Sequence, residues 1–274
     1  MQITPKTQLC ISLAARPGSF GVRFHNYLYA ALELDFVYKS CTTSDLPSAI
    51  QGIRALGIRG CGLSMPFKTD ALRWIDDVDA AALRLGAINT IQNTCGVLKG
   101  FNTDYLALVE LISSCSVPID RSVGVLGSGG MARAVLGALR DCGFESVTIF
   151  SRSEANGNAL AESFQYEWLS SDRVDGAGCR FLINATPIGM TVDSEEGCPF
   201  SDLAIEDAEF IFDSVVSIRA VGTPLIKRAR SLNKVVISGS DITVLQAKEQ
   251  FQIYTGIMPS NELVAAAAQY ALVK

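Results

Sequence analysis

Short apolar runs alternate with stretches of helical periodicity along nearly the whole chain. A short apolar run with polar or glycine borders is typical of a buried strand, and apolar positions three and four apart indicate one face of a helix. Before residue 122 the pattern predicts, in order, strand Leu9–Leu13, helix Phe20–Leu32, strand Phe36–Lys39, helix Leu46–Leu56, strand Arg59–Ser64, a helical region around Ala71–Leu85, apolar runs Ala87–Ile91 and Gly96–Phe101, helix Asn102–Ser113 and linker Ser114–Arg121. Asp45 is the predicted N-cap of the second helix.

A second unit begins at Ser122. Its pattern predicts strand Val123–Leu126, helix Met131–Cys142, strands Ser146–Phe150, Arg180–Asn184, Phe210–Asp213 and Lys234–Ser238, and helices Thr243–Tyr254 and Asn261–Val273. The alternation predicts an α/β protein with mainly parallel sheet.

Composition narrows the class of protein. The chain has 274 residues, of which 49% are hydrophobic and 19% charged, so it can bury a large core in one large or two medium domains. A net charge of −5 argues against nucleic-acid binding, and the short apolar runs predict no membrane span. The run Leu9–Ala15, which follows Lys6, is interpreted as a buried strand rather than a secretory segment.

The eight cysteines are scattered, with no Cys-x-x-Cys pair, so we expect a reduced, cytoplasmic protein without a metal site. The single histidine, His25, leaves a histidine-based triad only one candidate base.

A glycine-rich turn follows the first strand of the second unit. Its residues are Gly127, Ser128, Gly129, Gly130, Met131 and Ala132, the pattern G-x-G-x-x-A. In a strand–turn–helix context this pattern predicts a dinucleotide site: Gly127 permits the tight turn, Gly129 lets the backbone approach the pyrophosphate, and Ala132 lets helix and strand pack closely. The alternative is an ordinary glycine-rich turn.

The next strand ends at Ser151, Arg152 and Ser153, without an acid at its tip. An NAD site usually places an acid there for the ribose hydroxyl, whereas Arg152 can bind a 2′-phosphate and either serine can donate a hydroxyl. These residues predict NADP as cofactor. The alternative is that Arg152 is a solvated surface residue. This alternative stays open because Glu154, an acid of the kind found in NAD sites, lies two residues away.

Polar residues interrupt apolar surroundings in three segments of the first unit, Ser64–Lys68, Gly86–Thr90 and Gly100–Asp104. The first follows a predicted strand, where open α/β sheets place their ligands. Asp104 could instead complement the dipole of the helix it begins, and Lys68 could be a solvated loop lysine.

Together these segments resemble the shikimate dehydrogenase family, over the length of the chain. The matching stretches are His25-Asn26, Met65-Pro66-Phe67-Lys68, Gly86–Thr90, Gly100–Asp104, the glycine turn, Asn184-Ala185-Thr186-Pro187-Ile188-Gly189-Met190, Thr223-Pro224-Leu225, Gly239 through Gln246 and Tyr254-Thr255-Gly256.

The resemblance implies a substrate domain formed by residues 1–104 and 243–274, and a Rossmann-type NADP domain over 105–242. It implies hydride transfer between the nicotinamide and a ring carbon of a cyclohexene carboxylate such as shikimate, with Lys68 and Asp104 as the catalytic pair. The implied substrate-binding residues are Ser19, Ser64, Asn89, Asn102 and Gln246. The resemblance also places Thr186, Met190 and Gly239 beside the nicotinamide.

The chain departs from the family where the substrate carboxylate is held. Of the family's Ser-x-Ser-Pro run only Ser19 remains, with Gly21 and Val22 at the other two positions, and the family's tyrosine falls on Val216. Ser64 replaces a threonine. Each lost hydrogen bond to a charged group costs about 1.5–3 kcal/mol, so two losses weaken binding by about two to four powers of ten unless Arg16, Arg23 or another group substitutes.

We therefore expect a paralogue with weak shikimate activity or with another cyclic hydroxy acid as substrate. The alternatives are an NAD-dependent quinate/shikimate dehydrogenase and a non-catalytic ligand-sensing module of the same fold. The expected partner is the small-molecule substrate, and we expect no binding to nucleic acid or membrane. The expected oligomeric state is a monomer or homodimer.

Overall fold

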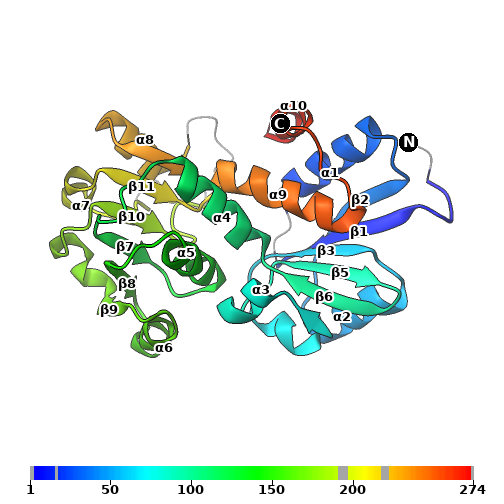
Figure 1. Cartoon of the computed structure of the whole chain (residues 1–274), viewed down its shortest axis with the longest axis horizontal. Helices are drawn as coiled ribbons and strands as arrows, with labels where there is room; N and C mark the ends of the chain where they lie inside the picture. The colour runs from blue at the N-terminus through cyan, green and yellow to red at the C-terminus, as the bar shows by residue number, and fades with distance from the viewer. Residues whose placement is uncertain (1–2, 16–17, 191–196, 217–221, 273–274) are drawn as a thin grey trace. The chain divides into compact units, whose positions relative to one another are not determined.

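The computed structural model describes residues 3–15, 18–190, 197–216 and 222–272, and the chain divides into two compact units (Figure 1). The first unit comprises Met1–Thr103 and Val244–Lys274, and the second is Asp104–Thr243. Both boundaries fall inside helices, α4 (Thr103–Ser114) and α9 (Gly239–Thr255). Strands and helices alternate through both units, which confirms the predicted α/β class.

The first unit is built on a six-stranded mixed sheet with the order β2-β1-β3-β5-β6-β4. Its strands are β1 (Gln8–Leu13), β2 (Phe36–Cys41), β3 (Gly60–Leu63), β4 (Asp77–Val78), β5 (Thr90–Thr94) and β6 (Val97–Phe101). β1 pairs in parallel with β2 and β3, but β5 is antiparallel to both β3 and β6. The β5–β6 hairpin turns at Cys95 and Gly96, both with positive φ, as a tight two-residue turn requires.

Residues alternate between two cores, one on each face of this sheet. Cys10 and Tyr38 pack with the helices α1 (Phe20–Ala31), α9 and α10 (Asn261–Leu272). Ile11 and Leu13 point the other way, toward α2 (Leu46–Ala55). As predicted, Asp45 caps α2 by accepting the N–H of Ser48 at 3.1 Å.

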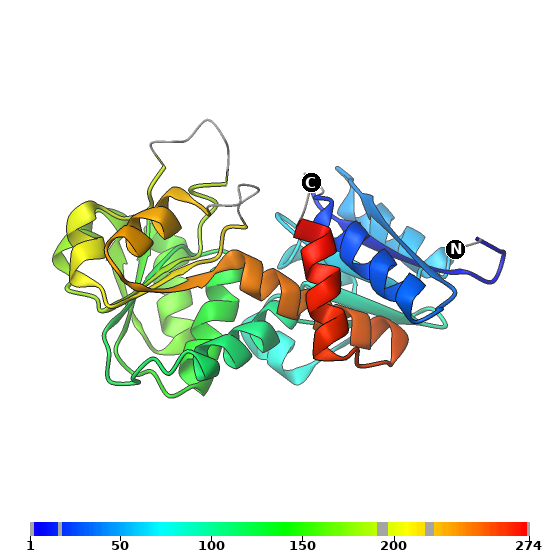
Figure 2. The same cartoon turned by 90° about the horizontal axis from the view of Figure 1, so that it is seen from above.

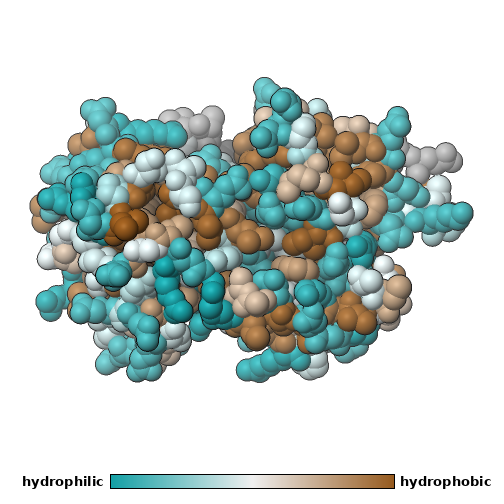
Figure 3. Space-filling model, in the orientation of Figure 1, coloured by the Kyte–Doolittle hydropathy of each residue, from teal (hydrophilic) through white to brown (hydrophobic). Residues whose placement is uncertain are grey.

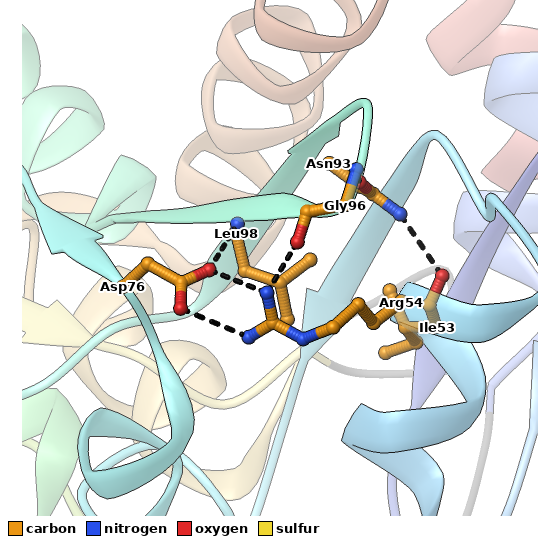
Figure 4. Close-up of polar contacts among 6 residues, drawn as sticks. All are labelled: Ile53, Arg54, Asp76, Asn93, Gly96 and Leu98. Carbon is orange, nitrogen blue, oxygen red and sulfur yellow. Dashed lines mark hydrogen bonds and ion pairs between the residues drawn. The ribbon is translucent and has the colours of Figure 1, made fainter.

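The predicted helical region around Ala71–Leu85 is wrong as one element. It divides into the 3₁₀ helix η1 (Asp70–Trp74), β4 and the helix α3 (Ala80–Leu85). Aspartates cause the division, because their carboxylates bind backbone N–H groups in competition with a continuous helix. Asp76 accepts the N–H of Leu98 and pairs with Arg54, both at 2.7 Å (Figure 4), and Asp79 caps α3.

The second unit is a doubly wound parallel sheet with the order β12-β11-β10-β7-β8-β9. Its strands are β7 (Val123–Leu126), β8 (Val147–Ser151), β9 (Glu167–Ser170), β10 (Phe181–Asn184), β11 (Phe210–Asp213) and β12 (Val235–Ser238). Read from β9, the order is 3-2-1-4-5-6, which is the arrangement of dinucleotide-binding folds. The strand direction predicted for this unit is confirmed.

Helices cover both faces of this sheet, with α5 (Gly130–Asp141) on one side and α8 (Pro224–Ser231) on the other (Figures 1 and 2). The pattern of apolar positions did not predict α8, α6 (Glu154–Phe164), α7 (Asp202–Asp207), η2 (Ser171–Gly176) or β9. Three of these helices begin at a capping hydroxyl, from Ser153, Ser201 and Thr223, which was the available signal.

Figure 3 shows apolar side chains interspersed with polar ones over the face in view. Scattered exposed apolar residues, such as Leu56 and Val97, are normal on a globular surface. Within the described ranges, every helix is too short or too polar to cross a bilayer.

Candidate active site

The glycine turn of the second unit lies where the strand order reverses, between β7 and β10. In parallel α/β sheets, ligands bind outside the carboxyl ends of the strands at this point. Gly127 has φ +126°, and a Cβ there would lie 2.9 Å from the carbonyl oxygen of Ala185, after β10. Only glycine fits this turn, and its effect is to bring the two loops together.

The N-terminus of α5 is open. Gly129 is its N-cap, makes no side-chain capping bond, and a Cβ there would meet no atom within 4 Å. Ala132 is buried against the sheet. Since the protein's own packing does not require Gly129 to lack a side chain, the space and the unpaired N–H groups suit an approaching phosphate. The residues present therefore fit a dinucleotide.

The tip of β8 differs in detail from the expectation. The hydroxyl of Ser151 is buried, accepts from Trp168 Nε1 and donates to the carbonyl of Ser153, both at 2.9 Å. A hydroxyl has one proton, so Ser151 has none left for a phosphate. Ser153 accepts the N–H of Asn156 and keeps its own proton. Arg152 is exposed and has no hydrogen bond or ion pair among the described residues.

A buried polar network holds the loop after β10. Asn184 accepts from the N–H of Thr186 at 3.0 Å and from its hydroxyl at 2.6 Å, and donates to Ile188 O at 3.2 Å and to Asp213 at 2.9 Å. Asp213 also accepts the hydroxyl of Thr223. Burial raises the pKa of the Asp213 carboxyl, and the hydrogen bonds oppose that rise. The network fixes the segment that carries Thr186 and Met190, both of which reach the surface.

Gly239 begins α9 against the loop that follows β11. A Cβ at this position would lie 2.6 Å from the carbonyl oxygens of Ser214 and Val215, so no side chain fits. The next residue of that loop is Val216, half-buried and without a polar atom where the resemblance implies a tyrosine.

In the first unit, two of the predicted substrate-binding residues, Ser64 and Asn102, directly follow strands. Ser64 is exposed directly after β3, and the half-buried Lys68 is anchored through its carbonyl, which accepts the N–H of Ile88 at 2.9 Å. Asn102 follows β6, is buried and uses one amide N–H on Ala87 O at 2.9 Å.

Asn89 is the most informative of these residues. It is 1% exposed, and its Oδ1 accepts from Thr90 Oγ1 at 2.9 Å and from the N–H and hydroxyl of Thr103 at 2.7 and 3.1 Å. Its Nδ2 is buried and has no partner among the described residues. A buried donor without an acceptor is costly, so this amide suits a ligand oxygen.

The returning helix α9 carries two candidate glutamines. The predicted residue, Gln246, is half-buried. Gln250, one turn later, is 4% exposed and donates to Thr90 Oγ1 at 3.0 Å, and sequence reasoning missed it. The signal was its spacing: Gln250 lies among the core positions Ala247, Phe251 and Tyr254 of the same helix face.

The residues considered for holding the substrate carboxylate are only partly placed as expected. Ser19 is the exposed N-cap of α1 and makes no capping bond. Gly21 lies within α1. Arg23, suggested as a substitute for the lost serine, points elsewhere: its guanidinium donates to Tyr270 O at 2.6 Å and stacks 4.6 Å from the Tyr270 ring. Arg16 lies outside the described residues.

His25 is a core residue. It is fully buried, its ring stacks 4.4 Å from that of Tyr38, and burial lowers its pKa to about 3. A histidine in this setting stays neutral and out of reach of solvent, so it does not suit general acid–base work.

Lys68 belongs to the first unit, and Asp104, the first residue of the second, is buried in the first turn of α4. Their pairing stays a prediction.

Comparisons with known proteins agree with these observations. Residues 18–91 match the family described as shikimate dehydrogenase substrate binding domain. The chain is 44% identical to a shikimate dehydrogenase-like protein of Haemophilus influenzae, over 99% of both chains. It is 33% identical to a shikimate dehydrogenase (NADP(+)) of Prosthecochloris aestuarii, over 89% of this chain and 90% of the relative.

Solved structures give the same result. A shikimate 5-dehydrogenase-like protein superposes with a TM-score of 0.88 at 43% identity, covering 98% of this chain and 99% of the other. The shikimate 5-dehydrogenase of Thermus thermophilus in complex with NADP(H) and shikimate has a TM-score of 0.83 at 29% identity, covering 96% and 99%.

Proposed function

Because this chain belongs to the shikimate dehydrogenase family, we propose that it is an NADP-dependent oxidoreductase that interconverts shikimate and 3-dehydroshikimate or a closely related cyclic hydroxy acid. Family membership supports an oxidoreductase acting on a CH–OH group. In this proposal the first unit binds the acid and the second binds NADP.

The observation that carries the proposal is the open N-terminus of α5 at the reversal point of the parallel sheet. Gly127 and Gly129 would hold the pyrophosphate through backbone N–H groups, and Arg152 would bind the 2′-phosphate with its two-pronged guanidinium. Relatives named as NADP(+) enzymes and a structure with NADP(H) support this cofactor.

When bound, NADP supplies the nicotinamide carbon that exchanges hydride with the substrate. Lys68 and Asp104 carry the proton chemistry in this proposal. In the reductive direction, charge builds on the ketone oxygen, and the Lys68 ammonium donates a proton to it. The Asp104 carboxylate holds that ammonium beside the oxygen, and Asn89 donates to a neighbouring oxygen of the ring. In the oxidative direction, neutral Lys68 accepts the hydroxyl proton.

The substrate preference follows from the missing hydroxyls. Gly21 and Val216 offer no polar side-chain atom for the carboxylate, and Arg23 is engaged with Tyr270. Among the residues that the structure describes, Ser19 alone remains of those predicted to hold this group. We expect weak shikimate binding, or a preferred acid whose carboxylate is held differently.

A two-cofactor substrate screen tests the proposal. Shikimate, quinate and related cyclic hydroxy acids are each offered with NADP and with NAD, and the absorbance of reduced nicotinamide is followed. We expect turnover of at least one acid with NADP, and loss of that turnover in Lys68→Ala. A preference for NAD with quinate would support the alternative dehydrogenase. Ligand binding without turnover in every combination would support the sensing module and overturn the proposal.

A further inference from the structure

A buried glutamine from the returning helix meets the threonine that follows Asn89. Gln250 Nε2 lies 3.0 Å from Thr90 Oγ1 and 3.4 Å from the carbonyl oxygen of Asn89. The room for this amide comes from Gly62 on β3: a Cβ there would lie 3.1 Å from Gln250 Nε2. The two positions are complementary, since a side chain on β3 would compete with the amide from α9.

The hydrogen bonds of this cluster have a defined direction. An amide nitrogen only donates, so Thr90 Oγ1 must accept from Gln250. A hydroxyl that has accepted keeps its single proton to donate, and Asn89 Oδ1 lies 2.9 Å from Thr90 Oγ1. Thr103 adds two further donors to the same Oδ1, at 2.7 and 3.1 Å. Gln250 therefore donates to Thr90, and three donors, from the Thr90 hydroxyl and from the N–H and hydroxyl of Thr103, converge on Asn89 Oδ1.

This convergence decides which way the Asn89 amide points. An asparagine side chain can be turned over so that oxygen and nitrogen exchange places, and its hydrogen-bond network selects one orientation. With Oδ1 held by three donors, the NH₂ group faces the opposite way. Nδ2 is buried and has no acceptor among the residues that the structure describes. What remains is a pair of N–H donors for which the described part of the chain supplies no acceptor.

We propose that Gln250 and Thr90 are positioning residues that lock the Asn89 amide with its NH₂ group toward the substrate, so that it donates to a hydroxyl or carboxylate oxygen of the bound acid. This inference rests on the proposed function, because the ligand is taken to be the hydroxy acid. Gln250 acts through Thr90, and Thr90 through Asn89.

Matched variants separate positioning from packing. Gln250→Met keeps the length of the side chain and removes its N–H groups. Thr90→Val keeps the shape and removes the hydroxyl, whereas Thr90→Ser keeps the hydroxyl and loses a methyl. Gln252→Met is the control on the same helix, at a half-buried position outside the cluster. NADP affinity and melting temperature close to wild type show that each variant folds.

The first readout needs no turnover. The side-chain NH₂ resonances of Asn89, assigned in nitrogen-15 spectra by their loss in Asn89→Asp, report the lock. We expect them to shift or broaden in Gln250→Met and Thr90→Val, and to stay in place in Thr90→Ser and Gln252→Met. In the wild type they should shift when shikimate or a better acid is added. The proposal is overturned if the Asn89 resonances change neither in Gln250→Met and Thr90→Val nor on addition of any acid.

The second readout is kinetic. On the best substrate found, Gln250→Met and Thr90→Val should each raise KM for the acid about three- to tenfold, as expected for one lost hydrogen bond, and leave KM for NADP unchanged. The double variant should be no worse than either single variant, because both act through one chain of bonds. If the increases in KM of the two single variants added up in the double variant, Gln250 and Thr90 would act independently, and the proposal would be overturned. If an acid shifts the Asn89 resonances but is never turned over, the proposed function is contradicted, while the positioning of Asn89 by Gln250 and Thr90 is supported.

Discussion

Asn184 donates to Asp213 across a 2.9 Å hydrogen bond between the carboxyl ends of β10 and β11. The pair joins two loops: Asn184 holds Thr186 and Ile188, while Asp213 accepts the N–H of Val215 at 3.2 Å. Both side chains are fully buried. The pair therefore sets the backbone on two sides of the region predicted to receive the nicotinamide.

We predict that Asp213→Asn weakens NADP binding and lowers the free energy of unfolding. The amide that replaces the carboxylate faces Asn184, Val215 and Thr223 with one acceptor fewer, and an unpaired buried group costs about 1–3 kcal/mol. NADP titration by fluorescence quenching and urea unfolding measure the two effects. Thr223→Val removes the donor to Asp213 and also the acceptor that caps α8, so it should weaken NADP binding less than Asp213→Asn while still lowering the free energy of unfolding. Unchanged NADP affinity in Asp213→Asn would show that the network does not shape the cofactor site.

Arg152→Ala should raise KM for NADP by at least tenfold and leave KM for NAD nearly unchanged, because the guanidinium would contact only the 2′-phosphate. Steady-state kinetics with both cofactors measure this. Glu154→Ala, which removes the acid two residues away on the same exposed tip, is the control and should not weaken NADP. Equal loss with both cofactors would mean that Arg152 is structural.

Gly21→Ser together with Val216→Tyr should lower KM for shikimate by about tenfold or more, since each restored bond to a charged group contributes about 1.5–3 kcal/mol. Gly21 has no left-handed φ, and a Cβ there would lie 3.4 Å from the Tyr38 ring, which is ordinary contact. Gly21→Ala supplies the same Cβ without the hydroxyl and should give no gain. A folded double variant that binds shikimate no better than Gly21→Ala would contradict this account.

Lys68→Ala should lower the turnover number about 10²–10⁴-fold with a much smaller rise in KM, as expected for an acid–base group. Asp104→Asn should give a similar loss, because it removes the carboxylate and keeps the shape. The double variant should be little worse than either single variant, since residues that act as a unit are not additive. NADP binding should stay close to wild type. Retention of most turnover in Lys68→Ala would refute the pair.

The protein should lose stability on acidification through His25. Burial lowers the pKa of His25 to about 3, whereas an unfolded histidine titrates near 6.5. Below pH 6.5 the unfolded chain binds a proton that the folded chain excludes, so the free energy of unfolding falls by up to about 1.4 kcal/mol per pH unit. Melting temperatures at pH 7.5 and 5 should differ less in His25→Phe than in wild type. Phe251→Leu, which keeps the histidine, should retain the full difference.

The sequence predicted strands such as β7 because their apolar runs are buried throughout. It did not predict β9, whose residues are largely exposed, or α8, whose first residue, Pro224, was noted only as part of a family motif. Local pattern carries little information about an edge strand, because few of its side chains enter the core.

For the candidate site too, some features could be predicted from the sequence and others could not. The resemblance named Asn89 and Asn102, and the structure places both in buried positions beside strands, Asn89 before β5 and Asn102 after β6; their roles stay predictions. Local sequence could not tell that the Ser151 hydroxyl donates to Ser153 or that Arg23 faces Tyr270, whereas the burial of Gln250 was readable from its spacing among core positions of α9. The contacts of Ser151 and Arg23 each depend on a partner supplied by packing, two to hundreds of residues away.

The first unit is interrupted in sequence, and this bears on the order in which the protein matures during synthesis. Its core joins Cys10 and Phe24 to Phe251 and Val264, so it cannot close until the last two helices have left the ribosome. The second unit is one continuous segment, Asp104–Thr243, and is complete before α10 is translated. Nascent chains should therefore carry a finished second unit beside an open sheet whose apolar face waits for α9 and α10, which makes that interval the natural point for chaperone contact or premature aggregation.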